Sequence, residues 1–580
     1  MKNNDPVIFT DKAKCEDCYR CLRNCPVKAI KIKDGQAFVD EDRCILCGKC
    51  INECPQNAKT VRNDIDKMLE LINSDNKVAV SIAPSYQGLF KKWKSKRFAS
   101  VLRSIGFDYI SETIVAASEV SKKSIEKNEK NENQKLATAC PVFVNYIEKY
   151  HHHFVDSMIR VKSPMQLHGI YLKKKLGENY KVVFIGPCIG KKQEAENEDK
   201  KSVDVVITFD EFIEYLNDEK IDFSNYEESV FDETGQKNAV YYPLTGGMFK
   251  AADIQPDCFS NQYIHVNGKN EIEDILRAES INKSLIEPLF CGQGCISGPG
   301  TLRFESSIFH RKTRMLELIE DESKREEKIK FNLPDRDYYR YFKAFNIDTE
   351  EIPEDKIREV LARTGKEDEE NQLNCGACGY DTCRQKAKAV IKGLAEDEMC
   401  IPYMRRLAEK RSDKIIEKSP NGIVILNEKL EILDINNSFK EMFGCSKSSL
   451  GKHISTIIDP DPMEKVLVSK QDVFEKTKKF DEHNLICYQL VYYLENENQI
   501  IGVFIDITSA KKNKERLKKI KSKAIDQAHE LLEHQIEVAQ KMTNYLGEST
   551  AKGEQLVKKL IEITNKESEN KSSFELEDWL

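Results

Sequence analysis

The chain has 580 residues, of which 40% are hydrophobic and 32% charged, and its net charge is -7. This length exceeds what one hydrophobic core supports, so several domains are expected, and the composition excludes a disordered chain. The acidic balance gives no general reason for nucleic-acid binding. The lack of an apolar run of about 18 residues argues against a membrane span, and the first residues, MKNNDPVIFT, lack the apolar run of a secretory signal. We therefore expect a cytoplasmic protein that binds neither nucleic acid nor a membrane.

The cysteines carry most of the chemical information. There are nineteen of them, and in a reducing cytoplasm their spacing indicates metal ligation or redox chemistry before disulfides. Sixteen fall into three groups along the chain. We therefore take the groups in chain order.

Residues 1–62 contain the pattern C-x2-C-x2-C-x3-C-P twice. Three cysteines spaced in this way wrap three corners of a [4Fe-4S] cubane, while the fourth serves the other cluster. We predict a bacterial-type ferredoxin module with two [4Fe-4S] clusters, one held by Cys15, Cys18, Cys21 and Cys54, the other by Cys44, Cys47, Cys50 and Cys25. The zinc alternative leaves the third cysteine of each triplet without a role. Short apolar stretches at 29–32 and 37–39 predict a small hairpin.

Residues 70–340 are predicted to form an α/β domain. Apolar runs at 78–83, 182–185 and 203–209 indicate buried parallel strands with helices between them. The almost wholly polar stretch 121–136 predicts an exposed loop. Four cysteines then come from three separate segments, TACP, GPCIGK and CGQGC, and they are Cys140, Cys188, Cys291 and Cys295.

These three segments resemble the signature segments of the [FeFe]-hydrogenase family, and the likeness extends to residues 143–150 and 162–166 and to Glu194. The resemblance implies an H-cluster, in which a [4Fe-4S] cubane on those four cysteines is joined through Cys295 to a two-iron subcluster carrying CO and cyanide. It also implies that Lys191 donates to a cyanide ligand. The candidate catalytic residues are thus Cys140, Cys188, Lys191, Glu194, Cys291 and Cys295.

The chain departs from catalytic members of that family along the proton path. Where those members have a proton-relaying cysteine it has Ala139, and the stretch that would supply carboxylates ends in Lys122, Lys123 and Ser124. Two methionines of the subcluster pocket are replaced by Gly186 and Leu289. Because a positioned acid or base contributes roughly 10² to 10⁴ in rate, we expect slow turnover. These departures resemble the sensory, PAS-containing branch of the family.

Residues 341–403 hold the third cysteine group, with the pattern C-x2-C-x4-C-x16-C. Glycines within it allow the tight turns that bring backbone amides toward cluster sulfurs. The segment resembles a small [4Fe-4S] domain of anaerobic redox proteins, and a structural zinc site is the alternative. The ligands would be Cys375, Cys378, Cys383 and Cys400.

Residues 404–510 resemble a PAS sensor domain, with a hairpin over 423–435, a helix after it, and a last strand at 502–508. Its ligand cannot be read from the sequence. Residues 511–580 are predicted to be a helical signalling and dimerisation segment, because apolar residues recur every seven positions from Leu517 to Tyr545. The basic run 511–523 is interpreted as the solvated face of this helix.

The expected fold is multidomain α/β and α+β. We expect a hydrogen or redox sensor of an anaerobe, with slow H2 activation, electron relay through [4Fe-4S] clusters and signal output through the PAS domain. The partners would be H2 and protons, a redox protein such as ferredoxin, a signalling protein and a second copy of the chain. The alternatives are a catalytic ferredoxin-linked hydrogenase and an iron–sulfur scaffold or electron-transfer protein that lacks the two-iron subcluster.

Overall fold

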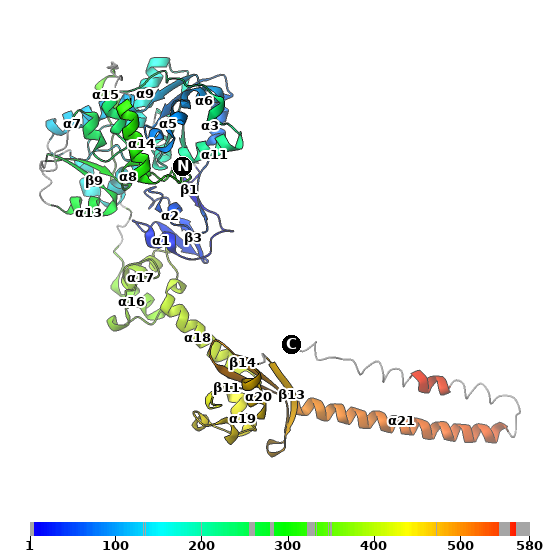
Figure 1. Ribbon diagram of the computed structural model, residues 1–580. Coiled ribbons are helices and arrows are strands. Elements are labelled where there is room, and N and C mark those ends of the chain that lie inside the picture. The colour runs from blue at the N-terminus through cyan, green and yellow to red at the C-terminus, as the bar shows by residue number, and fades with distance from the viewer. Residues whose placement is uncertain are drawn as a thin grey trace. The chain divides into compact units, whose positions relative to one another are not determined.

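The computed structural model describes residues 5–131, 133, 135–198, 200–254, 262–278, 284–321, 331, 333–345, 347, 351–470, 473–543 and 557–563. The chain divides into two compact units, Met1–Met404 and Arg405–Leu580, and each is described by itself. It is a multidomain α/β and α+β protein (Figure 1).

The N-terminal module is built from two similar halves. Its outer strands, β1 (Ile8–Thr10) and β4 (Lys59–Val61), pair antiparallel. The predicted hairpin is confirmed, because β2 (Ile30–Lys33) and β3 (Gln36–Val39) also pair antiparallel. Each half contributes one short helix after its cysteine triplet begins, α1 (Arg20–Asn24) and α2 (Lys49–Asn52).

A four-stranded parallel sheet forms the centre of the α/β domain, in the order β6-β5-β7-β8. Parallel strands are buried on both faces, so their sequences are continuous apolar runs. This is why β5, β7 and β8, three of the four strands, could be predicted from the sequence. The carboxyl ends of parallel strands meet at one edge, where ligand sites of α/β sheets form. The strands are β5 (Lys77–Ile82), β6 (Tyr109–Glu112), β7 (Tyr180–Gly186) and β8 (Val205–Thr208).

Helices and a second small sheet complete this domain. The second sheet pairs β9 (Tyr263–Asn267) in parallel with β10 (Leu285–Leu289). The helices are α3 (Ile65–Ile72), α4 (Tyr86–Leu89), α5 (Lys92–Ser95), α6 (Phe98–Ile105), α7 (Ile114–Lys130), α8 (Pro141–Tyr150), α9 (Pro164–Leu176), α10 (Gly190–Glu196), α11 (Phe209–Asp218), α12 (Gly247–Ala251), α13 (Gly268–Arg277), α14 (Ile308–Asp321) and α15 (Asp335–Tyr338).

The loop predicted over residues 121–136 is wrong for most of its length, because residues 121–130 continue α7. This helix buries small polar side chains: Ser121 and Ser124 are buried and donate to main-chain carbonyls one turn earlier. Its exposed side carries ion pairs of Glu126 with Lys123 and Lys130, at helical spacing. Within 121–130 the fully buried side chains are the serines Ser121 and Ser124, so this part of the helix has no apolar pattern and its sequence looks polar throughout.

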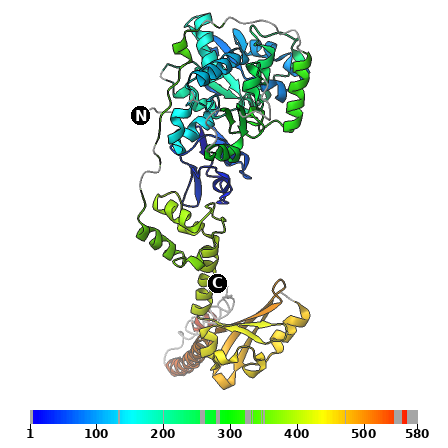
Figure 2. The same cartoon turned by 90° about the vertical axis from the view of Figure 1, so that its left-hand side faces the viewer.

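The third cysteine segment packs on the N-terminal module within the same unit (Figures 1 and 2). It contains α16 (Glu354–Arg363) and α17 (Cys383–Ile391) and leads into α18 (Ile401–Lys418). The amide of Ile32 donates to the carbonyl of Leu394 over 2.9 Å. Gly379, at a φ of +95°, lies so close to Leu22 that a Cβ there would come within 2.8 Å of it. Two cysteine groups far apart in sequence are therefore neighbours.

The second unit contains a five-stranded antiparallel sheet in the order β12-β11-β15-β14-β13. Its hairpin, following helix and last strand match the sequence prediction. The elements are β11 (Gly422–Asn427), β12 (Ile432–Ile435), α19 (Asn437–Phe443), α20 (Asp461–Ser469), β13 (Val473–Phe480), β14 (Leu485–Leu494) and β15 (Gln499–Asp506).

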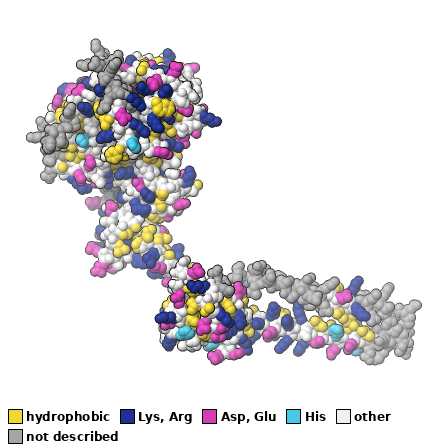
Figure 3. Space-filling view, in the orientation of Figure 1, with side chains coloured by type: hydrophobic (Ala, Val, Ile, Leu, Met, Phe, Trp, Pro, Cys, Tyr) yellow, Lys and Arg dark blue, Asp and Glu magenta, His cyan; other side chains and the backbone are white. Residues whose placement is uncertain are grey.

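The long helix α21 (Thr508–Thr543) follows this sheet. Its basic residues 511–523 are exposed, and Figure 3 shows Lys and Arg side chains gathered on its first half. Leu517 and Leu531 of the predicted heptad stripe are 58% and 64% exposed, whereas Tyr545 lies outside the described residues. Within the part of the chain that is described, no helix has the length and apolarity to span a membrane.

Candidate metal centres

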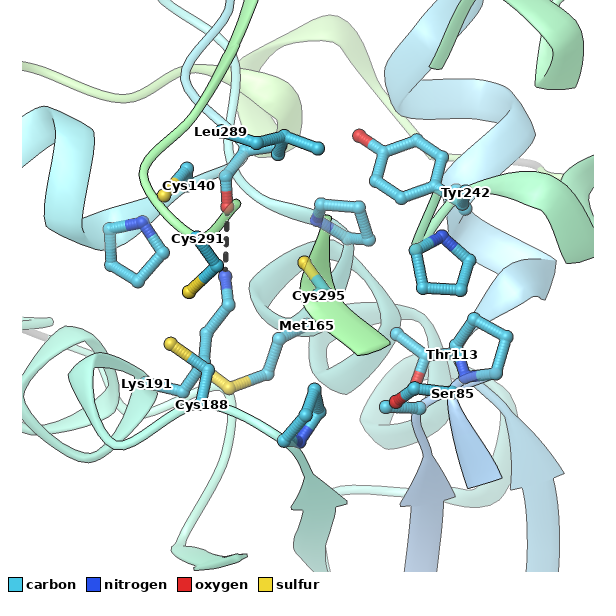
Figure 4. A pocket seen from close by; sticks show the side chains of 18 of the residues that line it. Ser85, Thr113, Cys140, Met165, Cys188, Lys191, Tyr242, Leu289, Cys291 and Cys295 are labelled. Carbon is cyan, nitrogen blue, oxygen red and sulfur yellow. Dashed lines mark hydrogen bonds between the residues drawn. The ribbon is translucent and has the colours of Figure 1, made fainter. Parts of the chain in front are cut away.

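A cavity of about 100 Å³ lies at the carboxyl edge of the parallel sheet (Figure 4). Ser85 follows β5, Thr113 follows β6 and Cys188 follows β7, so three strand ends supply part of the wall. Segments from outside the sheet close it, and all four predicted H-cluster cysteines are among the lining residues: Cys140, Cys188, Cys291 and Cys295. Three segments far apart in sequence thus meet at one place.

Local structure presents each of these thiols to the cavity. Cys140 caps the N-terminus of α8, where Pro141 occupies the first helical turn. Cys188 lies in the turn between β7 and α10, and Cys295 begins a short 3-10 turn. Burial raises the pKa of the Cys188 thiol to about 12 and that of Cys291 well above its ordinary value. Thiols in such surroundings ionise readily only when a metal takes the thiolate.

Lys191 reaches the cavity from the first turn of α10. Its Nζ donates to the carbonyl oxygen of Ala139 over 3.1 Å, as the dashed line in Figure 4 shows, and to Glu194 over 2.6 Å. The Ser163 hydroxyl donates to the same carboxylate over 2.9 Å, and Arg340 forms an ion pair with it. Although burial favours the neutral acid, Lys191 and Arg340 outweigh it and hold the pKa of Glu194 below its ordinary value.

Glu194 therefore stands behind Lys191 rather than in the cavity wall, and it positions that ammonium group. Arg340 completes this arrangement from a segment almost 150 residues further on, as the positions in the sequence show. Sequence reasoning missed Arg340, because nothing in the sequence around position 340 indicates that it pairs with Glu194 on α10.

Two hydroxyl groups in the cavity have no hydrogen-bond partner among the described residues. Ser85 Oγ and Tyr242 OH are buried side-chain atoms for which the described residues supply no hydrogen bond. A buried polar group without a partner costs about 1 to 3 kcal/mol, so these positions favour a bound polar group that pairs with them. Most of the remaining wall is apolar, including Met165 and Leu289 (Figure 4). The residues present therefore fit a cubane with an attached group bearing polar ligands.

Two of the predicted departures from the family pattern lie in the wall of this cavity. Ala139 and Leu289 both line it. Gly186 does not, and a Cβ there would lie 2.4 Å from the Phe184 ring, which therefore takes the space of a longer side chain. Met165 contributes a thioether near Cys188 and Lys191, so one soft side chain is still present (Figure 4).

In the N-terminal module, Cys25 lies with the triplet of the other half, and Cys54 lies near Cys18 of the triplet opposite it. One small cavity is lined by Cys25 together with Cys44, Cys47 and Cys50. In the other half, the thiols of Cys18 and Cys54 both reach Gln56 Oε1, at 3.7 and 3.9 Å. Backbone amides of Ala29 and Ala58 donate to Cys25 and Cys54, each over 3.2 Å. The two halves thus repeat the same sulfur environment.

The half of this module that contains Cys47, called the inner half here, lies beside the cavity of the four H-cluster cysteines. A Cβ on Gly48 would lie 2.3 Å from Pro299, which shows how closely the two domains approach beside Cys47. Cys47 is also one of the charges that add to burial in raising the pKa of Cys291. A cluster on the inner cysteines would therefore be next to one on the cavity cysteines.

The third cysteine group also surrounds a cavity, lined by Cys375, Cys378, Cys383 and Cys400. Lys366 Nζ lies 3.0 Å from Cys400 Sγ and 3.4 Å from Cys383 Sγ. Sequence reasoning missed this lysine, because it precedes the cysteine pattern and nothing local marks it. Nowhere in the described part of the chain do three or more His, Cys, Asp or Glu side chains converge on a point that would hold a single metal ion.

Family comparisons assign each cysteine group to a known domain type. The iron only hydrogenase large subunit, C-terminal domain, matches residues 76–299, and a 4Fe-4S dicluster domain matches residues 14–58. An Fe-S cluster family matches residues 371–402, and a PAS domain matches residues 410–478. These matches confirm the multidomain fold class that was predicted from the sequence.

Curated relatives include both hydrogenases and assembly factors. Iron hydrogenase 1 of Clostridium pasteurianum is 26% identical over 306 residues, which are 42% of this chain and 53% of that protein. The cytosolic Fe-S cluster assembly factor NAR1 of Kluyveromyces lactis is 42% identical over 97 residues, 17% of this chain and 20% of that protein. A solved structure of [FeFe]-hydrogenase HydA1 from Chlamydomonas reinhardtii matches 49% of this chain and all of that one, with 15% identity and a TM-score of 0.38. The chain spans between a fifth and about half of the length of these two curated relatives.

Proposed function

Because this is a hydrogenase-like iron–sulfur protein that also carries a PAS domain, we propose that it is a hydrogen or redox sensor that activates H2 slowly at an H-cluster. The observation that carries this proposal is the cavity itself. It brings the four cysteines together with Lys191 and with the buried hydroxyls of Ser85 and Tyr242, for which the described part of the chain offers no hydrogen-bond partner.

A bare cubane scaffold would need the cysteines but no further polar groups. The hydroxyls of Ser85 and Tyr242 and the ammonium of Lys191 are donors that suit cyanide and CO ligands, and hydrogen bonds to anionic acceptors are the stronger kind. When bound, low-spin iron with these strong-field ligands supplies the centre that polarises H2. The chain orients that group through Lys191 and keeps bulk water out with its apolar wall.

Slow turnover is expected from Ala139, the residue that precedes the first cluster ligand, Cys140. Ala139 lines the cavity, and its methyl group cannot carry a proton. Without a donor at this position, proton delivery limits the rate, which suits a sensor more than a catalyst.

Electrons would pass between the cavity and three further cubanes. The cluster on Cys25, Cys44, Cys47 and Cys50 is the one beside the cavity, and the Cys375 group packs against the same module. A redox protein such as ferredoxin would exchange electrons with them. The output would pass through the PAS domain and a homodimer formed by α21 to a signalling protein in the cytoplasm.

A second candidate function is cluster assembly without hydrogen chemistry. Curated relatives named cytosolic Fe-S cluster assembly factors favour it, among them one of Drosophila persimilis that is 28% identical over 288 residues. This function needs the cysteines, but it does not explain why the hydroxyls of Ser85 and Tyr242 are buried in the cavity without a partner among the described residues.

Infrared spectroscopy separates the two functions. The full chain is loaded anaerobically with iron, sulfide and a two-iron complex that bears CO and cyanide, and excess complex is removed. The sensor proposal expects CO and cyanide stretches in the wild-type protein and none in Cys295→Ser. Wild-type protein that holds its cubanes but shows no such bands would contradict the proposal and favour the scaffold.

A further inference from the structure

A series of hydrogen-bonded, mostly buried polar side chains runs from the cavity, past strands β5 and β6, to the protein surface. At their centre is His168 on α9, which is fully buried. Its Nδ1 lies 2.7 Å from Ser81 Oγ, and its Nε2 lies 3.0 Å from Ser111 Oγ. Ser81 and Ser111 are register partners on the adjacent strands β5 and β6, so one imidazole bridges two strands.

The inner end of this connection is a cavity residue. Ser81 Oγ lies 2.8 Å from Thr113 Oγ1, and either hydroxyl can donate. Thr113 lines the cavity that holds the four cysteines, on the side where Ser85 also lies (Figure 4). The connection therefore begins at the site where protons are consumed or released in the proposed function.

The outer end reaches the surface. Ser111 Oγ donates to Glu233 Oε2 over 3.4 Å, and Glu233 Oε1 accepts from Lys175 Nζ over 2.8 Å. The Lys175 side chain is 39% exposed, whereas that of Glu233 is 8% exposed. Lys175 lies seven residues after His168, which places both on the same face of α9.

We propose that Thr113, Ser81, His168, Ser111 and Glu233 form a proton relay, the His168 relay, between the cavity and solvent at Lys175. The inference rests on the proposed function, because the proton it carries is the one exchanged at the cavity. It supplies a path that does not pass through Ala139 or the Lys122–Ser124 stretch, the two places where the sequence departs from the family's path.

Each transfer conserves atoms and charge. A proton arriving at the Thr113 hydroxyl releases that group's own proton to Ser81, and Ser81 passes one to His168 Nδ1. His168 gives up its Nε2 proton to Ser111, which protonates Glu233, and Glu233 returns its proton to water at the surface. No electron moves, and the hydroxyls and the imidazole must turn back before the next transfer. Burial lowers the pKa of His168 to about 3, so the ring is neutral and has one nitrogen free to accept.

The competing interpretation is purely structural: the imidazole ties α9 to two strands and satisfies two buried hydroxyls. That role needs one fixed tautomer, since each ring nitrogen then keeps one partner and one direction. A relay needs both neutral tautomers, because every passage exchanges them. The tautomeric state therefore separates the two interpretations without any measurement of turnover.

The first experiment is ¹⁵N NMR of the full chain with labelled histidine, its cubanes oxidised and no two-iron complex added. His168→Gln identifies the His168 signals by their loss. The relay expects two ring nitrogens with intermediate shifts, the signature of exchange between tautomers. Ser111→Ala should lock one tautomer. Ser121→Ala removes an equally buried hydroxyl that donates to the Ala117 carbonyl, outside the His168 relay, and should leave the exchange unchanged. A single fixed tautomer in the wild-type protein overturns the proposal.

The second experiment uses the loaded protein. Ser111→Ala should slow H2 and D2O isotope exchange by roughly 10-fold to 100-fold relative to Ser121→Ala, with the CO and cyanide bands at unchanged positions. Equal exchange rates in the two variants overturn the relay. Missing bands in the wild-type protein reject the proposed function instead, and the tautomer measurement then decides the relay by itself.

Discussion

The ammonium nitrogen of Lys191 lies 3.1 Å from the carbonyl oxygen of Ala139 and donates a hydrogen bond to it. This bond holds the main chain beside the first cavity cysteine, so a side chain introduced at position 139 would leave the backbone at a fixed point of the wall. Glu194 and Arg340 hold Lys191 from behind. The site is thus prepared for a proton donor that the chain does not have.

Ala139→Cys should increase H2 evolution by about 10-fold to 10³-fold, because a thiol at this position restores one proton-transfer step. Hydrogen production with a chemical reductant measures it. Ala139→Ser is the matched control: its hydroxyl has a similar size but is a far weaker acid, and we expect a much smaller gain. If both variants match the wild type while their infrared bands are normal, proton delivery at position 139 does not limit the rate.

Cys54→Ser should expose Cys15, Cys18 and Cys21 to alkylation, while Cys25→Ser should expose Cys44, Cys47 and Cys50. The reason is the exchange of fourth ligands between the two halves. Mass spectrometry after anaerobic alkylation reads out which thiols lose protection, and the two variants control each other. Loss of protection within each variant's own half would show that the ligands do not cross.

Lys366→Met should lower the reduction potential of the cluster on the Cys375 group. The ammonium lies 3.0 Å from Cys400 Sγ and stabilises the more negative, reduced state. A charge-assisted hydrogen bond of about 1.5 kcal/mol corresponds to a shift of about 60 mV for one electron. Potentiometric titration followed by EPR measures it, and Lys366→Arg should keep most of the wild-type value. Zinc in place of iron at these cysteines would remove the basis of this prediction.

Lys192→Met should destabilise the chain by about 3 to 5 kcal/mol at neutral pH, because it removes the fully buried cation that Asp64 and Glu211 share. Lys192 Nζ lies 2.7 Å from Asp64 and 2.8 Å from Glu211, and its side chain is fully buried. Lys67→Met is the control, since Lys67 pairs with the same Asp64 but is 53% exposed, and we expect a loss below about 1 kcal/mol. Denaturant unfolding at neutral pH compares the two, and equal losses would contradict the prediction.

The ion pair between Lys192 and Asp64 should also make the stability of the chain depend on pH in the acid range. Burial favours neutral Asp64, but Lys192 together with Lys67 and Arg62 outweighs it and keeps the pKa of Asp64 below its ordinary value of 3.8. A carboxyl whose pKa is lower in the folded state contributes stability above its unfolded pKa, and this contribution disappears as the pH falls through the folded value. The difference in stability between wild type and Lys192→Met should therefore shrink at and below pH 3.8. A constant difference across that range would rule out this linkage.

Leu531→Glu should convert a dimer of the full chain into a monomer. Leu517 and Leu531 lie on the heptad stripe of α21 and are exposed, and a charge at such a position opposes helix pairing. Light scattering after gel filtration measures the mass. Lys519→Glu, at an exposed position outside the stripe, should leave the mass unchanged. A wild-type monomer would refute the dimer directly.

The sequence by itself determined the features that depend on short spacing. Three thiols on one loop, the apolar runs of the parallel strands and the hairpin of the second unit are local patterns, because each arises from neighbours within a few residues. The four cavity cysteines could be grouped from sequence only through their resemblance to a family. The prediction of an exposed loop over 121–136 was wrong for residues 121–130, because a helix face of small polar residues gives no local signal in the sequence.

Only the tertiary structure decided which distant groups meet. Arg340 reaches Glu194, Lys366 reaches Cys400, and His168 joins two strands to a cavity hydroxyl, although nothing in the sequence near any of them indicates the partner. Such contacts form when packing of the whole domain brings the segments together, and a buried polar group then takes whichever partner lies within hydrogen-bond distance. The spacing of the cysteine ligands can therefore be predicted from the sequence, whereas the residues that surround and tune those ligands are decided by the tertiary structure.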